Sequence, residues 1–508
     1  MPPAAEIELK LIVTRGRVAD LRRRLPRTGL RRAQVDDLYF DTADGSLRGH
    51  GLVLRLRHDG RRWLQTLKAA DRGAHVVSER GEWEFALGVG KGRPSLELGR
   101  FAGTPLGALI ESGLTVDALV PIFRTRFVRR RLTLSHAASS IEVALDDGDL
   151  IAARGSRSER RPIAEVELEL KSGTPADVMD LAKTLLIKGD ATLVPALRSK
   201  AERGYALATT TPLSVARASA PGFAALMAPE ISSGNALRAV IGHGLAVVVA
   251  NADALRGTPA IEHLHQARVA LRRMRSAIRL LDPQGTDVPG SEVRRLQKLA
   301  HVLGEARDWD VLCEATLPAL LAHGAQDARV AGALAGSSRR LRAKSMEDVV
   351  KAVGSRRYAR LVLGLGAWSM SESPPSPRLA DIAGALLELL GDDVAAGARA
   401  FDGLSRDERH RLRIHAKRLR YALDLLRFAL PAKGAAHYLD ALGTLQDTLG
   451  ALNDAAVARE RLVRAISLPG GRRLVKDWFA AVEPPLVRKA ARELSALARR
   501  KRPWHAAR

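Results

Sequence analysis

The chain has 508 residues, 46% hydrophobic and 4% aromatic, so it is too long for one hydrophobic core and too apolar for a disordered polymer. Its formal charge of +25 favours a polyanionic partner, namely nucleic acid, an anionic membrane surface or a phosphate polymer. The single cysteine, Cys313, excludes a disulfide framework and a cysteine-based zinc site. Because neither a signal peptide nor a run of about 18 apolar residues occurs, we expect a cytoplasmic protein without membrane insertion.

Residues 1 to about 205 alternate apolar and charged side chains with the period of two that predicts antiparallel β-strands. The charged positions of a strand tend to carry one sign, as in Arg55 and Arg57 or in Glu165 and Glu167. One interpretation is a sheet with a solvated charged face. The other is a closed barrel whose lumen holds acids and bases around a metal ion and an anion, because unpaired buried charge is costly. The alternating stretches are EIELKLIV, LVLRLRH, WLQTLKA, SERGEWEFAL, FRTRFVRRRLTL, IEVALDD and AEVELEL.

Eight short motifs occur in order across residues 5–206: EIELK, YFDT, LRLR, TLKA, GEWEF, RTR, AEVELEL and SKAERGY. This ordered set resembles the CYTH, or triphosphate tunnel metalloenzyme, family. The resemblance implies an eight-stranded antiparallel β tunnel barrel with flanking helices that acts on triphosphates. It also implies bound Mg²⁺ or Mn²⁺, the hard cations that carboxylates prefer.

The resemblance assigns site residues by position in these motifs. The expected metal ligands are Glu6, Glu8, Glu165 and Glu167, with Asp146 as a further acid. The expected triphosphate ligands are Lys10, Arg55, Arg57, Lys68, Arg124, Arg126 and Lys200. The expected catalytic residues are Lys10, Glu82 and Glu84. Two alternatives stay open: Glu82 and Glu84 are structural partners of the tunnel arginines, and a second metal rather than Lys10 activates the water.

The second half changes to the helical period, with long Ala, Leu and Arg segments that stop at LLDPQG, FALPAKG and SLPGG. The stretch between the halves has the composition of a linker. We therefore predict a barrel domain at 1–207, a linker at 208–224 and a helical domain at 225–508. A Pro- and Ser-rich break, SMSESPPSPR, divides the helical domain into repeats at about 225–368 and 379–505.

Two segments of the helical half repeat each other: HQARVALRRMRSAIRLL begins at His265, and HRLRIHAKRLRYALDLL begins 145 residues later at His410. Each predicts a helix with a stripe of basic side chains beside an apolar face. Like charges three and four residues apart repel, so the stripes favour an anion or a run of acids lying against them. The candidate acids for an internal network are Asp308, Asp310, Asp447 and Asp454.

A second repeated phrase, LGEARDWDVL and LGALNDAAVA, follows the two basic segments. Together these phrases resemble the CHAD family. The resemblance implies an all-α domain of two pseudo-repeated four-helix bundles with a basic surface or channel, associated with inorganic polyphosphate. The residues that we expect to bind polyphosphate are His265, Arg268, Arg272, Arg273, Arg275, His410, Arg413, Lys417, Arg418 and Arg420.

The sequence thus predicts an α+β multidomain protein that hydrolyses inorganic triphosphate, or short polyphosphate ends, with a divalent metal. The basic helices would bind polyphosphate and associate the enzyme with polyphosphate granules. The alternatives are a non-catalytic polyphosphate adaptor and a tunnel with adenylate cyclase or thiamine triphosphatase activity. Nucleic acid is disfavoured as a partner because base stacking needs exposed aromatic side chains, and the chain has few. No oligomeric state follows from the sequence.

Overall fold

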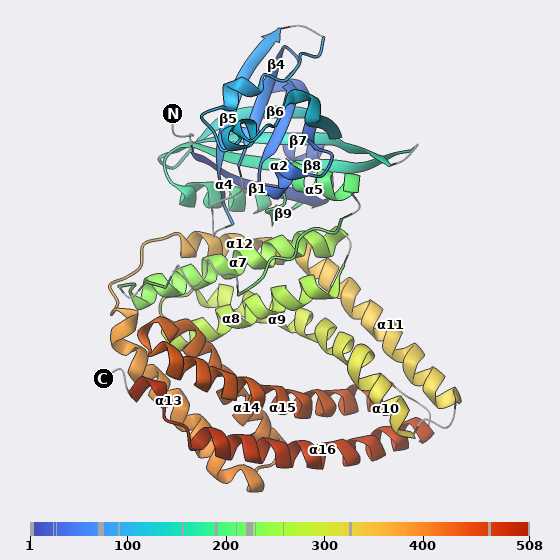
Figure 1. Ribbon diagram of the computed structural model, residues 1–508, viewed down its shortest axis with the longest axis vertical. Helices are drawn as coiled ribbons and strands as arrows, with labels where there is room; N and C mark the ends of the chain where they lie inside the picture. The colour runs from blue at the N-terminus through green and yellow to red at the C-terminus, as the bar shows by residue number, and fades with distance from the viewer. Residues whose placement is uncertain are drawn as a thin grey trace. The chain divides into compact units, whose positions relative to one another are not determined.

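The computed structural model describes residues 5–505 except 24, 27, 70–75, 90–91, 155–156, 188–190, 210, 220–226, 229, 258, 325–327 and 466–468. The chain forms two compact units, whose strands and helices are drawn in Figure 1. The first, the barrel unit, comprises Met1–Ala216, Leu245–His263 and Val353–Ser371. The second, the helical unit, comprises Arg217–Gly244, Leu264–Ala352 and Glu372–Arg508.

The barrel unit contains an antiparallel sheet of nine strands in the order β5-β4-β3-β2-β6-β7-β8-β1-β9. Because β5 also pairs with β1, eight strands close into a ring and β9 adds alongside β1. The strands are β1 (Ala5–Arg15), β2 (Arg31–Thr42), β3 (Val53–His58), β4 (Arg62–Lys68), β5 (Ser78–Val89), β6 (Leu119–His136), β7 (Ser139–Arg154), β8 (Arg157–Ser172) and β9 (Thr192–Ala196).

The sheet therefore has nine strands rather than the expected eight. The additional strand, β9, has the sequence TLVPA, and all five of its residues are buried. A short strand buried on both faces shows no apolar and polar alternation, so the pattern that predicted the other strands does not reveal it. Its proline, Pro195, lies opposite Leu11 of β1. Because β9 is the outermost strand, the missing N–H of the proline is tolerated there.

At β3 and β4, the apolar side chains of the ring face outward and are covered by short helices and turns. Leu54, Leu56 and Leu67 of β3 and β4 are fully buried and cluster with Phe101 and Leu106. Since successive residues of a strand point to opposite faces, the charged residues between them, such as Arg55, point into the ring. The covering elements include α2 (Ser46–Gly49), the 3₁₀ turn Leu98–Phe101 and α3 (Gly107–Glu111).

Four further helices complete the barrel unit. They are α1 (Val18–Arg22), α4 (Pro175–Ile187), α5 (Lys200–Thr209) and α12 (Arg356–Ser369), joined by residues 245–257 of α7 (Ser233–Gly257). Helix α5 packs closely on β6, where a Cβ on Gly204 would lie 2.1 Å from the Phe123 ring. Helix α12 packs on α4 and β9 through a buried apolar face that includes Leu361, Val362 and Leu365.

The units first change between Ala216 and Arg217, inside the linker expected at 208–224, but two later segments, 245–263 and 353–371, return to the barrel unit. Residues 353–371, assigned by sequence to the first helical repeat, pack with the barrel because α12 buries its apolar face there. Part of the expected linker is also held by hydrogen bonds. The carbonyl of Ala216 accepts from Asn251 Nδ2 at 2.8 Å, and Arg198 Nη1 donates to Ser214 Oγ at 3.1 Å.

The helical unit is built from long helices, and one large apolar cluster is described within it. Its helices are residues 233–244 of α7, α8 (Ile261–Leu281), α9 (Gly290–Val311), α10 (Leu317–Gly324), α11 (Ala328–Val353), α13 (Leu379–Ala400), α14 (Arg406–Leu426), α15 (Ala432–Ala465) and α16 (Pro469–Ala498). In the second repeat, α13 to α16 pack on one another in succession, and α15 and α16 run side by side in Figure 1. One core gathers Trp309 and Leu320 with Leu462, Trp478 and Phe479.

The helix bounds match the repeat found in the sequence. Helices α8 and α14 both have 21 residues, and each end of α14 lies 145 residues after the corresponding end of α8. The repeats differ in one respect: α12, which the sequence assigned to the first repeat, belongs to the barrel unit. Among the described residues, one helix, α7, is long and apolar enough to cross a bilayer, and 72% of its apolar window is buried inside the protein.

Candidate functional site

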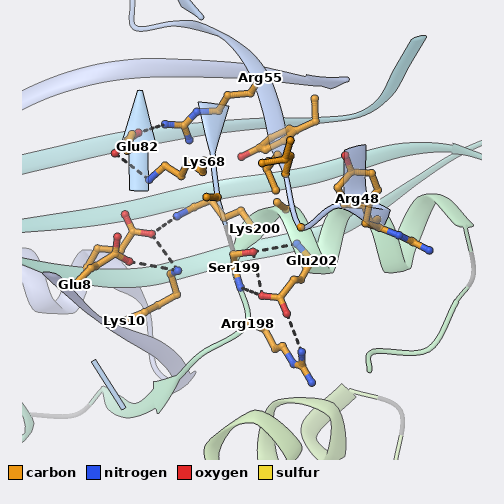
Figure 2. A pocket seen from close by; sticks show the side chains of 18 of the residues that line it. Glu8, Lys10, Arg48, Arg55, Lys68, Glu82, Arg198, Ser199, Lys200 and Glu202 are labelled. Atoms are coloured by element: carbon orange, nitrogen blue, oxygen red, sulfur yellow. Dashed lines mark hydrogen bonds and ion pairs between the residues drawn. The ribbon is translucent and has the colours of Figure 1, made fainter. Parts of the chain in front are cut away.

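The ring of strands encloses a cavity of about 980 Å³ whose lining is charged. Figure 2 shows side chains of both signs converging there from different strands and from α5. The cavity brings together most of the residues that the sequence assigned to the tunnel. The assigned residues in its lining are Glu8, Lys10, Arg55, Arg57, Lys68, Glu82, Glu84, Glu167 and Lys200.

Three carboxylates form a cluster in the barrel unit: Asp146 of β7 with Glu165 and Glu167 of β8. One oxygen of each lies within 4.8 Å of the others. The ammonium of Lys200, at the first position of α5, contacts Asp146 at 2.8 Å, Glu165 at 2.9 Å and Glu167 at 2.6 Å. Arg129 of β6 donates two hydrogen bonds to Asp146, at 2.8 and 2.7 Å, and a third to Glu167 at 2.5 Å.

The two glutamates of this cluster stay ionised at neutral pH. Burial disfavours the charged form of Glu165, but Arg203, Lys200 and Lys10 outweigh it and lower its pKa to about 2. Burial likewise opposes charge on Glu167, yet Lys200 and Arg129 hold its pKa well below the usual range. The acids in turn raise the pKa of Lys200 and of Arg129 against the cost of burial. Each ion is therefore stable only while its partners are present.

The cluster has the donor set of a magnesium or manganese site, because it offers carboxylate oxygens close together on two adjacent rigid strands. The cation that these oxygens hold is the Lys200 ammonium. A divalent ion bound by the same oxygens must therefore displace it. Glu8, a further expected ligand, pairs with Lys10 at 3.3 Å, and Lys10 lies 3.8 Å from Glu167. The side chain of Glu6 lies outside the described residues.

A second group of charges lies on β2 to β5. Arg57 makes a two-pronged contact with Asp37, at 2.7 and 2.8 Å, and Arg55 lies 3.5 Å from the same carboxylate. Asp37 is fully buried. Although burial opposes its ionisation, Arg57 and Arg55 lower the pKa of Asp37 to about 2. The sequence analysis missed Asp37 because it stands beside a second aspartate, Asp36. Asp37 nevertheless lies on the same face of β2 as the buried Val35 and Tyr39.

The two glutamates of β5 contact cavity cations and a hydroxyl. Glu82 lies 3.4 Å from Arg55 and 3.3 Å from Lys68, contacts that Figure 2 marks. Glu84 accepts a hydrogen bond from Thr66 Oγ1 at 3.2 Å. The contact between Glu82 and Arg55 agrees with the alternative in which this acid is a structural partner of a tunnel arginine, whereas the contact of Glu84 is to a hydroxyl.

Two expected triphosphate ligands, Arg124 and Arg126, are not in the cavity lining. Their side chains are 44% and 52% exposed, and both pair with Asp36 on the outer face of the sheet. The motif FRTRFVRRR places arginines on both faces of β6, and the odd-numbered positions face inward. Arg129 and Arg131 line the cavity instead. Side chains an odd number of positions apart on a strand point to opposite faces, so these arginines face inward while Arg124 and Arg126 face outward.

In the helical unit, several of the expected polyphosphate ligands have protein partners. Arg273 of α8 pairs with Asp424 of α14 at 2.7 Å, and Arg268 lies 3.6 Å from Asp308. Further side-chain contacts join His410 Nδ1 to Asn453 Oδ1 at 2.9 Å, Arg413 to Asn453 at 3.2 Å, and Arg420 to Gln446 at 3.1 Å. The internal network is therefore present in part, although Asp310 pairs with Arg342 of α11 rather than with a basic stripe.

The two basic stripes nevertheless meet. Burial, and then repulsion from Arg413, Arg272 and Arg268, lowers the pKa of Lys417 to about 7. Loss of hydration also lowers the pKa of Arg272, whose guanidinium lies 5.1 Å from the centre of the Tyr421 ring. Within the described part of the chain, no carboxylate is within ion-pair distance of Lys417, Arg272 or Arg413. We call Arg268, Arg272, Arg413 and Lys417 the cation cluster.

The ring of strands around a cavity of sorted charges, and a helical unit with two basic stripes, define a two-domain protein. Comparison with known families divides the chain by sequence, and its second part includes residues 245–263 and 353–371 of the barrel unit. Residues 4–205 match the CYTH domain, and residues 239–463 match the CHAD domain. The chain is thus a CYTH domain followed by a CHAD domain.

Three known proteins are similar to parts of this chain. An inorganic triphosphatase of Haemophilus influenzae is 32% identical over 205 residues, which is 40% of this chain and 54% of that protein. An uncharacterised protein of Mycobacterium tuberculosis is 30% identical over 217 residues, 40% of each chain. The chain thus spans about half or less of these curated relatives. The crystal structure of the CHAD domain from Ricinus communis is 29% identical, covers 57% of this chain and 98% of that one, and has a TM-score of 0.49.

Proposed function

We propose that the barrel cavity hydrolyses the terminal phosphoanhydride bond of inorganic triphosphate, or of short polyphosphate ends, with Mg²⁺ or Mn²⁺. The observation that carries this proposal is the sorting of charge, since the barrel unit holds a three-carboxylate cluster and, apart from it, the cations Arg55, Arg57 and Lys68. The relative from Haemophilus influenzae, named as an inorganic triphosphatase, supports the same substrate class.

Asp146, Glu165 and Glu167 would hold the metal, which supplies neutralisation of charge on the phosphate chain. Lys200 would then leave the carboxylates and become available to phosphate oxygens. Arg57 and Arg55 are already fixed by the buried carboxylate of Asp37, so their remaining N–H groups bind phosphate at a small entropic cost.

In the reaction, a water oxygen adds to the terminal phosphorus and the bridging P–O bond breaks. With triphosphate, diphosphate leaves with the bonding electron pair, and the attacking water releases its proton to solvent. Negative charge spreads over the outer oxygens in the transition state, where fixed cations stabilise it more strongly than mobile water does. Lys10, ion-paired with Glu8 in the cavity lining, would orient the attacking water.

Phosphate release from tripolyphosphate, measured with Mg²⁺ or Mn²⁺ and with a chelator, tests this proposal. We expect release only with metal, and its loss in Glu167→Gln. Glu159→Gln, a change on the same strand at a glutamate that pairs with Arg161, is the matched control and should keep full activity. Full activity of Glu167→Gln would refute the metal assignment, and formation of cyclic AMP from ATP would replace triphosphatase by adenylate cyclase.

We also propose that the cation cluster binds inorganic polyphosphate. Four basic side chains from two helices lie close together, and three of them lack a carboxylate partner within the described residues. Tethering such a site to the barrel would raise the concentration of phosphate chain ends near the cavity, and would associate a cytoplasmic enzyme with polyphosphate granules.

Polyphosphate retention by the full chain at several salt concentrations tests the second proposal. Binding should weaken as salt rises, since counterions are released. It should also fall in Arg272→Glu but not in Arg411→Glu, because Arg411 is 64% exposed on α14. Retention that is unchanged in Arg272→Glu would show that the stripe is structural. Binding without any phosphate release would favour the non-catalytic adaptor.

A further inference from the structure

The helical unit contains a second cavity, of about 750 Å³, that is separate from the cation cluster and is enclosed largely by α8, α13 and α14. Its walls are mostly apolar. The apolar lining includes Ile278, Val288, Leu386, Leu389, Leu390 and Leu425. Leu389 is 66% exposed, so the apolar surface is open to solvent at that position. A surface of this kind in water favours occupation by an apolar group.

The repeat of α8 and α14 shows that charge at this cavity is unbalanced. Arg273 of α8 pairs with Asp424 of α14 at 2.7 Å. The residue 145 positions after Arg273 is Arg418, and the residue 145 positions before Asp424 is Arg279. The pseudo-symmetric counterpart of an arginine–aspartate pair is therefore two arginines, and both line this cavity.

The two arginines lie close enough to affect each other. Loss of hydration, followed by repulsion from Arg275 and Arg418, lowers the pKa of Arg279. The Nε atom of Arg418 is buried without a hydrogen-bond partner among the described residues. Neither Arg279 nor Arg418 has an ion pair with a carboxylate in that part of the chain. Two guanidiniums that line one cavity beside apolar walls repel each other unless an anion lies against them.

The acids that line the cavity have other partners. Asp282 accepts backbone hydrogen bonds from Thr286 and Val288, both at 2.9 Å, and so shapes the turn after α8. Asp393 pairs with His415 at 3.1 Å. Asp424 is paired with Arg273. The described carboxylates of the cavity lining therefore leave Arg279 and Arg418 without a counter-charge.

We propose that this cavity binds a small amphipathic organic anion, with its phosphate or carboxylate group between Arg279 and Arg418 and its apolar body against Leu386 and Leu389. The site differs from the barrel cavity and from the cation cluster in having an apolar wall, which inorganic polyphosphate could not use. Arg418, assigned by sequence to polyphosphate, belongs to this second site.

Calorimetric titration of the full chain with dodecyl phosphate, below its micelle concentration, tests the proposal. We expect saturable binding with one site per chain. Arg279→Asp, which recreates the pairing of Arg273 with Asp424, should weaken binding by about tenfold or more because a charged donor becomes a repelling acid. Arg411→Asp makes the same charge change at an exposed position of α14 and should leave affinity within about twofold. Leu389→Ser should weaken binding through the apolar wall.

Three outcomes would overturn the proposal. These are no binding of dodecyl phosphate, unchanged affinity in Arg279→Asp, and tripolyphosphate binding at this site as tightly as dodecyl phosphate. Arg279→Gln keeps the test decisive if the aspartate variant does not fold. Retention on phosphatidic acid vesicles without binding of the monomeric probe would point to a membrane surface and would also refute a free ligand. Polyphosphate retention by Arg279→Asp should stay unchanged, which separates this site from the cation cluster.

Discussion

The Nζ atom of Lys200 lies 2.6 Å from an Oε atom of Glu167, so the first residue of α5 neutralises an acid of β8. The same ammonium contacts Asp146 and Glu165. Under the proposed function, a metal ion and Lys200 would therefore compete for one set of oxygens. Because a buried ion without its partner is costly, metal binding and the position of Lys200 are expected to be coupled.

Arg129 and Arg124 lie on the same strand but face opposite sides of the sheet. Replacing each by glutamine therefore distinguishes the loss of a cation in the cavity from the loss of one on the surface. Arg129→Gln removes a cation from the cavity, and we expect a loss of about a hundredfold in kcat/KM for tripolyphosphate. Arg124→Gln, which acts on an exposed side chain, should stay within about twofold. Equal losses in the two variants would contradict the inward face that the structure assigns to β6.

Asp37→Asn should destabilise the barrel unit. The change leaves Arg57 and Arg55 beside a neutral amide in a buried position, which costs about 3 kcal/mol of unfolding free energy. Asp36→Asn is the matched control, because its partner Arg124 is exposed, and the cost there should be less than about 1 kcal/mol. Urea denaturation of both variants measures the difference, and a similar midpoint for the two would refute the argument.

Acidification should unfold the barrel unit. Asp37 and Glu165 have folded-state pKa values of about 2, below their ordinary values of 3.8 and 4.5. Between these values the unfolded chain binds more protons, so stability rises with pH. The stabilisation is complete above about pH 4.5 and is lost as the pH falls through about 2. Thermal unfolding from pH 7 to 2.5 should show a falling Tm, and a Tm independent of pH would contradict both pKa assignments.

Polyphosphate affinity should increase as the pH falls through neutrality, because Lys417 has a pKa of about 7 and must be protonated to attract the anion. One linked proton changes affinity by at most about tenfold per pH unit. Lys417→Arg keeps its charge, so it should bind tightly at both pH 6 and pH 8 and lose this part of the dependence. Titrations at constant salt measure the slope. An unchanged slope in Lys417→Arg would refute the assignment of this pH dependence to Lys417.

The lowered pKa of Lys417 also predicts that stability increases as the pH rises, which is the opposite direction to polyphosphate affinity. Its folded-state value of about 7 lies below the ordinary 10.5, so between these values the unfolded chain binds more protons. Stability of the helical unit without polyphosphate should therefore rise as the pH increases from about 7 to 10.5. Chemical denaturation of wild type and Lys417→Gln should show this rise in the wild type alone.

Gly204→Ala should destabilise the contact between α5 and β6, because the new Cβ would lie 2.1 Å from the Phe123 ring. Phe123 is held by stacking on Tyr39, with ring centres 4.3 Å apart, so it has little freedom to move. We expect a loss of about 1–3 kcal/mol. Gly99→Ala, where nothing lies within 4 Å, should be nearly neutral. Since α5 begins with Lys200, metal-dependent activity should fall along with stability in Gly204→Ala.

Several features of the molecule could be read from local pattern. The alternation along β1, β3 and β8 placed Glu8, Arg55 and Glu167 on one face of their strands, and the structure gathers them in one cavity. The repeated phrases predicted two matching helices, and α8 and α14 have the same length. Such properties depend on residues two to four positions apart, so they are determined before the chain folds.

Other features depended on contacts between distant segments. Local alternation in β6 allows either face to point inward, because arginines occupy both, and closure of the ring selected Arg129 over Arg124. The same holds for β9, which has no polar face to mark it, and for α12, whose apolar face packs on α4 rather than within its own repeat. The sequence by itself determined which residues share a strand face or a helix stripe. Only the tertiary structure decided which of those faces is enclosed, because burial is set by partners far along the chain.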